Sequence, residues 1–289
     1  MSTYVVGVAG DPDEQAGLEW ASAVAQPDDH IVVVHAWEIP IVTGYESVAA
    51  VDTKVIEDGA RDYLAALVDR RDDRRLRGVL AAGHPGQALV DAAADPGLGD
   101  DVCIVVAHAG SSKIGLVLGS TANHVVHHAR VPVVVVRGEL RLPVRTVVVG
   151  VDDPHEDHPD EPSLTALRWA LERPGITRLE VHHGAFVPGV AAGVVASPAV
   201  ESEEESHEID GQLRDAIAAA LDGAPPPADT QIVPVVAGGT GAFALIEASR
   251  TADLIVIGTR GHRTLMQLIT GSTSLEVVAH AHCPVVVVR

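Results

Sequence analysis

Short runs of valine and isoleucine alternate along this chain with longer segments rich in alanine and leucine. The short runs lack the alternation of apolar and polar residues that marks a half-exposed strand, so we predict strands covered on both faces. Strands that alternate with helices are typical of βαβ units. The pattern therefore predicts an α/β fold built around a mainly parallel sheet.

The same pattern predicts five strands and four helices in each half of the chain. The predicted strands cover residues 4–8, 31–36, 78–82, 102–106 and 133–136, then 146–151, 178–182, 231–236, 254–257 and 285–288. The predicted helices cover residues 14–25, 55–70, 86–94 and 120–128, then 162–171, 204–221, 241–249 and 272–280.

The second half also repeats particular residues of the first. A Gly-Ser-Thr segment at residues 119–121 recurs at 271–273, and a proline followed by four valines and an arginine occurs at 132–137 and again at 284–289. A repeat of about half the chain length indicates a duplicated domain. We place the boundary between residues 138 and 145, which gives domains at 1–138 and 145–289.

The last predicted strand of each half consists of four valines. If such a strand ended its sheet, its unpaired edge would be prone to aggregation. Pairing of residues 133–136 with residues 285–288 would cover both edges and relate the two halves by a pseudo-two-fold axis. We predict this pairing.

The formal net charge of -20, with Lys54 and Lys113 as the two lysines, argues against a nucleic-acid partner. Such a surface repels a phosphate backbone, and an aromatic content of 3% leaves few rings on which bases could stack. An anionic ligand would therefore be held locally, by backbone N–H groups and helix ends.

The two cysteines, Cys103 and Cys283, lie one in each half without metal-ligand spacing, so we expect buried, reduced thiols in a cytoplasmic protein. The chain does not open with a secretory signal pattern. The longest uncharged stretch, residues 184–200, is interrupted by proline and glycine and is too short to span a bilayer, so we expect a loop there.

A glycine-rich segment follows the fourth predicted strand of the second half. Gly258 is followed by Gly261 and, after nine intervening residues, by Gly271 and Ser272 at the start of a predicted helix. Glycines allow a ligand to approach the backbone closely, and a helix start offers free N–H groups and positive potential. This segment is a candidate phosphate site, although spaced glycines alone are a weak signal.

The expected topology places a carboxylate near this segment. In open parallel sheets, ligands bind outside the carboxyl ends of the strands, where the strand order reverses. The first strand of the second half ends in Gly150-Val151-Asp152 at that point. Asp152 could accept hydrogen bonds from ribose hydroxyls or from an amino group of a base.

The glycine spacing, Asp152 and the terminal proline-valine strand together resemble the ATP-binding branch of the universal stress protein family, over essentially the whole chain as two tandem copies. The resemblance implies two Rossmann-like domains of the adenine nucleotide alpha hydrolase type, which bind ATP, often with Mg²⁺ or Mn²⁺. It also implies that a homodimer and a regulatory protein partner are to be expected.

The resemblance assigns roles to residues of the second half. Asp152 would contact the adenosine, as would the residues around His182 and His183, with Gly150 nearby. Ile257 and Gly258 would flank the nucleotide. The phosphates would be bound by Gly261, Gly271, Ser272, Thr273 and Ser274.

The first half departs from this pattern. Ala9 stands in the place of Asp152, Ala107 or Val106 replaces the first glycine, and eight residues instead of nine separate the next two glycines. A phosphate corner could persist there at Gly110, Lys113, Gly119, Ser120 and Thr121. We expect weaker recognition of adenosine in this half.

An acidic insertion at residues 152–161 of the second half contains His155 and His158. Imidazole and carboxylate groups can both bind metals, but a solvated acidic loop explains the composition equally well, so we assign no dedicated metal site. Most of the 15 histidines are expected to be surface or packing residues.

The function that these observations favour is an ATP-binding regulatory protein of the stress response. We find no nucleophile paired with a base in the sequence, so we expect at most weak ATPase activity and assign no catalytic residue. Two alternatives remain open: a slow ATP hydrolase or nucleotidyl-transfer enzyme that uses the same site, and a nucleotide-free scaffold that dimerises.

Overall fold

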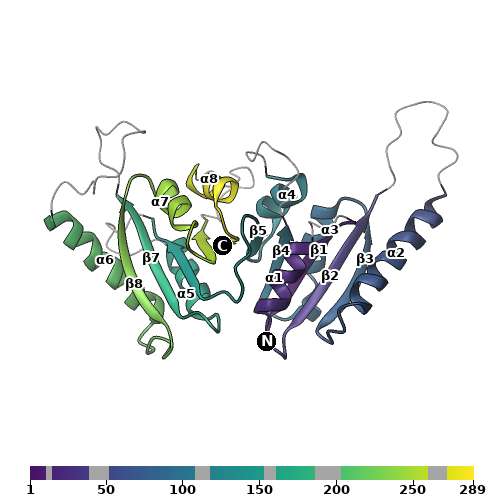
Figure 1. Ribbon diagram of the computed structural model, residues 1–289, viewed down its shortest axis with the longest axis horizontal. Helices are drawn as coiled ribbons and strands as arrows, with labels where there is room; N and C mark the ends of the chain where they lie inside the picture. Colours follow the sequence, from purple (N-terminus) through teal and green to yellow (C-terminus); the bar gives the residue numbers. More distant parts are fainter. Residues whose placement is uncertain (11–14, 39–51, 108–117, 153–160, 186–202, 260–271) are drawn as a thin grey trace. The chain divides into compact units, whose positions relative to one another are not determined.

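The computed structural model describes all residues of the chain except 11–14, 39–51, 108–117, 153–160, 186–202 and 260–271 (Figure 1). The described residues form two compact units. Of the described residues, those up to Val133 other than Leu118 belong to the first unit, and Leu118 and those from Val134 onward belong to the second.

The first unit is a parallel sheet with helices on both faces. Its elements are β1 (Thr3–Val8), α1 (Ala16–Val24), β2 (His30–Trp37), α2 (Thr53–Asp69), β3 (Leu76–Ala82), α3 (Pro85–Ala93), the 3-10 turn η3 (Pro96–Leu98), β4 (Val102–Ala107) and α4 (Ser120–His128). Strand β1 pairs in parallel with β2 and β4, and β2 pairs in parallel with β3, so the strand order is β3-β2-β1-β4.

The second unit repeats this arrangement. Its elements are β5 (Val133–Val136, of which Val133 is the last residue of the first unit), β6 (Thr146–Gly150), α5 (Glu161–Leu171), β7 (Arg178–Ala185), α6 (Glu203–Leu221), β8 (Gln231–Gly238), α7 (Gly241–Ala248), β9 (Leu254–Gly258), α8 (Ser272–His280) and β10 (Val285–Val288). The strand order is β5-β10-β9-β6-β7-β8. The predicted pairing of β5 with β10 is therefore confirmed, whereas the pseudo-two-fold axis stays a prediction.

Neighbouring residues of β1 show how helices cover both faces of the first sheet. A Cβ atom on Gly7 would lie 2.9 Å from Leu89 of α3, whereas Val6 contacts the Cβ position of Gly17 in α1 at 3.6 Å. Successive residues of a strand point to opposite faces, so α1 and α3 cover opposite faces of the sheet. This two-sided cover explains why the interior strands are runs of buried valine and isoleucine (Figure 1).

The outermost strands differ from the prediction of complete burial. In β3 the residues are exposed or half-buried, and in β8 the six residues between the exposed ends are half-buried. Both strands lie at the end of the strand order in their unit, where each has a neighbour on one side. The sequence pattern could not reveal this because an end strand can carry the same apolar residues as an interior one.

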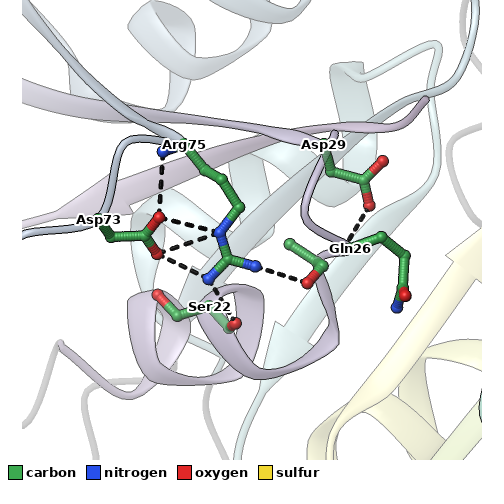
Figure 2. A network of polar contacts seen from close by, with 6 residues as sticks. Ser22, Gln26, Asp29, Asp73 and Arg75 are labelled. Carbon is green, nitrogen blue, oxygen red and sulfur yellow. Dashed lines mark hydrogen bonds and ion pairs between the residues drawn. The ribbon is translucent and has the colours of Figure 1, made fainter.

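Arg75 fastens the end of α1 to the segment that precedes β3 (Figure 2). Its guanidinium group donates to the carbonyl oxygens of Ser22 at 3.0 Å and Ala25 at 2.6 Å. It also binds both carboxylate oxygens of Asp73, with Nε–Oδ1 at 2.9 Å and Nη2–Oδ2 at 2.6 Å. The last carbonyls of a helix have no partner within the helix, so Arg75 satisfies groups that α1 leaves open.

We expect Arg75→Lys to lower the free energy of unfolding by about 1–3 kcal/mol, because a lysine ammonium cannot reproduce the planar set of donors. Urea denaturation followed by circular dichroism measures this change. Arg61→Lys is the matched control: its pair with Glu57 is exposed, and we expect a change within about 0.5 kcal/mol. Equal effects of the two variants would contradict the role of Arg75.

The Arg75–Asp73 pair also predicts a dependence on pH. The hydrogen bond from Arg75 is the main cause that lowers the pKa of Asp73 below its ordinary value of 3.8. The pair therefore contributes its full stability above pH 3.8, and this contribution is lost as the pH falls through the lowered pKa.

Candidate functional site

The carboxyl ends of β6 and β9 lie side by side in the second unit. The two strands pair in parallel, with Val147 opposite Leu254 and Gly150 opposite Ile257. The chain continues from β6 to β7 on one side, whereas β9 lies on the other. The strand order therefore reverses between β6 and β9, which is where open parallel sheets bind ligands.

Asp152 lies directly beyond the buried end of β6. Val151 is buried, and Asp152 is exposed. The backbone N–H of Asp152 donates to Oγ of Ser163 at 3.0 Å, and Ser163 is itself buried in the first turn of α5. This bond fixes the main chain of Asp152 at the strand end.

Gly258 ends β9 against the same turn of α5. A Cβ atom at this position would lie 2.1 Å from the carbonyl oxygen of Pro162. No side chain fits there, so the glycine lets β9 and the start of α5 approach each other closely. Asp152 therefore contacts Ser163 and Gly258 lies against Pro162, which are neighbouring residues in the first turn of α5. This turn bounds one side of the point where the strand order reverses.

The start of α8 forms the next part of the site. Thr259, which follows β9, is buried and donates its N–H to the carbonyl oxygen of Val288 at 2.9 Å. Helix α8 begins at Ser272, with Thr273 exposed and Ser274 half-buried. The methyl group of Thr273 is 3.8 Å from the Cβ position of Gly241, so α8 begins beside the start of α7.

His183 contacts the end of β6 from β7. Its Nδ1 lies 3.1 Å from the carbonyl oxygen of Val151. His35 makes the equivalent contact in the first unit, with Nδ1 2.9 Å from the carbonyl oxygen of Val8. Because a carbonyl oxygen can only accept, Nδ1 carries the proton in both residues. The duplicated contact indicates that these histidines fix the ends of the first strands.

His182, next to it on β7, lies in a different environment. Burial lowers its pKa, although the carboxylate of Glu180, 2.9 Å from Nε2, opposes that shift. Burial alone would raise the pKa of Glu180, but hydrogen bonds from His182 and Arg178 bring it below its ordinary value. His182 is buried whereas His183 is half-buried, so His183 is the better candidate for a ligand contact.

The equivalent corner of the first unit holds an aromatic side chain. The hydroxyl group of Tyr63 in α2 donates to the carbonyl oxygen of Ala9 at 2.5 Å, and its ring lies 4.9 Å from the ring of His35. Tyr63 therefore packs at the end of β1, beside the position that corresponds to Asp152. Sequence reasoning missed this residue.

The remaining predicted site residues are distributed as follows. Helix α4 begins at Ser120 and Thr121, directly after Gly119. Gly110, Lys113, Gly261 and Gly271 lie outside the described residues, as do His155 and His158 of the acidic insertion. Among the described residues, no group of three or more histidine, cysteine or acidic side chains is arranged to hold a metal ion.

Comparison with known proteins decides the family. The sequence profile of the universal stress protein family matches residues 1–137 and again 143–289. The chain belongs to the universal stress protein family. The repeat that is visible in the sequence therefore corresponds to two domains of this family.

Full-length relatives support this assignment. The chain is 26% identical to Universal stress protein Rv1996 of Mycobacterium tuberculosis, over 99% of this chain and 94% of the relative. A universal stress protein of Mycolicibacterium smegmatis is 25% identical, over 99% of this chain and 96% of the relative. The crystal structure of a universal stress protein from Archaeoglobus fulgidus has a TM-score of 0.70 at 18% identity, over 99% and 98% of the two chains, and confirms the fold.

Two further sequence predictions concern the cysteines and the membrane. Cys103 and Cys283 are buried free thiols, as predicted, and burial raises the pKa of Cys283 to about 12. Within the part of the chain that the structure describes, every helix falls short of the length or apolar character that crossing a membrane requires.

Proposed function

We propose that the second unit binds ATP at the carboxyl ends of β6 and β9, and that nucleotide occupancy changes the conformation or the partners of a regulatory protein of the stress response. The observation that carries this proposal is the exposed Asp152 at the point where the strand order reverses. A carboxylate there can accept hydrogen bonds from the ribose or the base.

The phosphates would lie toward the start of α8. A net charge of -20 disfavours a phosphate over most of the surface, but the N-terminus of a helix carries positive potential and free N–H groups. Mg²⁺ needs few protein ligands when it binds a nucleotide, because the phosphates and water supply most of its oxygen ligands. The hydroxyl oxygens of Thr273 and Ser274 are suitable ligands for an accompanying Mg²⁺ or Mn²⁺.

We further propose one nucleotide per chain. In the first unit, Ala9 cannot supply the carboxylate that Asp152 supplies, and Tyr63 packs against the carbonyl group of Ala9. Loss of an acceptor and the presence of a ring at the same corner both disfavour adenosine. Equilibrium dialysis with labelled ATP should therefore give a stoichiometry near one.

We expect Asp152→Asn to raise the Kd for ATP roughly 10- to 100-fold, because hydrogen bonds to a charged acceptor contribute about 1.5–3 kcal/mol. Dialysis of the full chain measures this change. Asp215→Asn removes the same charge from an exposed position of α6 and should leave the Kd unchanged. Two bound nucleotides per chain, or equal affinities of the two variants, would contradict the proposed site.

A single-turnover assay of the full chain distinguishes the regulatory role from the enzyme alternatives. Rapid release of phosphate in a single-turnover assay, abolished by Asp152→Asn, would show an ATP hydrolase in place of a regulatory nucleotide-binding protein. A scaffold that works without nucleotide would give no measurable ATP binding in the dialysis experiment.

A further inference from the structure

Three histidine rings of the first unit form a stack between α3 and α4. The ring centroids of His84 and His124 are 4.9 Å apart, and those of His124 and His128 are 4.2 Å apart with an angle of 21° between the rings. His84 precedes α3, whereas His124 and His128 lie one turn apart in α4.

One hydrogen bond of the stack, at His84, requires an unprotonated ring nitrogen. Nδ1 of His84 accepts the backbone N–H of Gly86 at 3.2 Å, which makes His84 the N-cap of α3. Nε2 of His124 faces Oε1 of Gln87 at 3.3 Å, and Nδ1 of His128 donates to the carbonyl oxygen of His124 at 2.8 Å. Each ring thus has one nitrogen committed as a donor or acceptor.

The two helices are in close contact at this point. A Cβ atom on Gly86 would lie 2.7 Å from Cβ of His124, so α3 passes directly over the histidine. Burial is the main cause that lowers the pKa of His124, and the neighbouring His128, His84 and His127 lower it further. From α3, the carboxylate of Asp91 opposes this shift.

A second proton on these rings would disrupt the contact in two ways. Protonated His84 could no longer accept the N–H of Gly86, and its charge would lie at the positive end of α3. Protonated His124, which is half-buried, and His128, which is exposed, would repel each other across stacked rings. Both effects weaken the packing of α3 on α4.

We propose that this histidine stack is an acid-sensitive latch, which holds α3 against α4 when its rings are neutral and releases them when the rings are protonated. The latch belongs to the first unit and does not depend on nucleotide binding by the second. It would let acidification act on α4, the helix that begins directly after Gly119.

The second unit provides an internal comparison because it lacks the stack. Thr240 caps α7 in the place of His84, with its Oγ1 accepting the N–H of Phe243 at 3.2 Å. Glu276 corresponds to His124 in the repeat, and His280 corresponds to His128. His280 keeps the contact of its Nδ1 with the carbonyl oxygen four residues earlier, at 2.9 Å.

The direction of the pH effect follows from the folded-state preference for neutral His124. A lowered folded pKa means that the unfolded chain binds more protons at mildly acidic pH. The latch therefore contributes its full stability above the ordinary histidine pKa of 6.5 and loses it as the pH falls through the lowered value.

Hydrogen exchange of the full chain at pH 7.5 and pH 5.5, corrected for intrinsic exchange rates, tests the proposal. We expect protection of α3 and α4 to fall by up to about tenfold at the lower pH through the titration of His124, because pH 5.5 lies one unit below the ordinary histidine pKa of 6.5. Helices α7 and α8 should keep their protection. His124→Gln should remove most of the acid response, and the control His280→Gln should leave it intact.

A second variant keeps the test decisive if the first variant does not fold. His128→Gln removes the outer ring of the stack and should reduce the acid response even if His124→Gln does not fold. An equal loss of protection in α7 and α8, or a full acid response in both stack variants, would overturn the proposal. A response that EDTA abolishes would also overturn it, because the rings would then bind a metal ion.

Discussion

Replacement of Gly258 by alanine is expected to destabilise the second unit by about 3 kcal/mol and to weaken ATP binding with it. The added methyl group would lie 2.1 Å from the carbonyl oxygen and 2.4 Å from the carbonyl carbon of Pro162. These are backbone atoms at the start of α5, and they can move only if the helix or the end of β9 shifts. Forced shifts of this kind typically cost about 1–3 kcal/mol or more.

Urea denaturation of the full chain, followed by circular dichroism, measures the loss. Gly211→Ala is the matched control, because nothing lies within 4 Å of its Cβ position in α6. There the substitution should stabilise the protein by about 0.5–1 kcal/mol through the higher helix propensity of alanine. If both variants unfold at the same urea concentration as the unchanged chain, the close approach of β9 to α5 is wrong.

An effect on ATP binding would distinguish Gly258 from a residue that contributes to packing alone. The end of β9 and the main chain of Asp152 both rest on the first turn of α5, through Pro162 and Ser163. A shift of that turn would therefore move the proposed adenosine contact as well. We expect the Kd for ATP to rise in Gly258→Ala even at temperatures where the variant remains folded.

The last helix and strand of each half were predictable because local residues determine their ends. Helices α4 and α8 begin directly after a glycine and end at a histidine, and β5 and β10 follow a proline, all with the predicted bounds. Glycine and proline act on the backbone at their own positions, without help from distant residues. The repeat then doubled the signal, since each copy supports the other.

Strand lengths were less predictable, because pairing partners determine them. Strand β7 extends to Ala185, beyond the predicted end at His182, since His183 and Gly184 pair with Val236 and Ala237 of β8. The prediction of a loop from residue 184 was therefore wrong for Gly184 and Ala185, which belong to the strand. Register with a neighbouring strand is a tertiary property, and no local pattern in the sequence reveals it.

The candidate site likewise contains residues that the sequence reveals and residues that it does not. Asp152 was recognisable from its place after a strand and from its contrast with Ala9 in the other copy. The contact of Tyr63 with Ala9 was not, because it joins residues that are 54 positions apart. The signal that could have pointed to Tyr63 is its place beside the buried Leu64, as an aromatic residue on the margin of the apolar face of α2.

Replacement of Gly138 by alanine should destabilise the second unit even more than the change at Gly258. Its φ of +62° lies in the left-handed region, and a Cβ atom would be 2.1 Å from the carbonyl oxygen of His282. That oxygen accepts the N–H of Glu139 at 2.8 Å, so relief of the clash would break a hydrogen bond as well. Strain, clash and the lost bond together lead us to expect a loss of about 4 kcal/mol.

Gly175→Ala separates the two main causes of this loss. Gly175 has a φ of +84°, but nothing lies within 4 Å of its Cβ position, so its substitution carries the cost of the left-handed backbone alone. We expect about 1–2 kcal/mol for that variant in urea denaturation, and at least about 2 kcal/mol more for Gly138→Ala. Equal losses would mean that the backbone conformation accounts for the whole effect and that the segment after β5 does not pack tightly against His282.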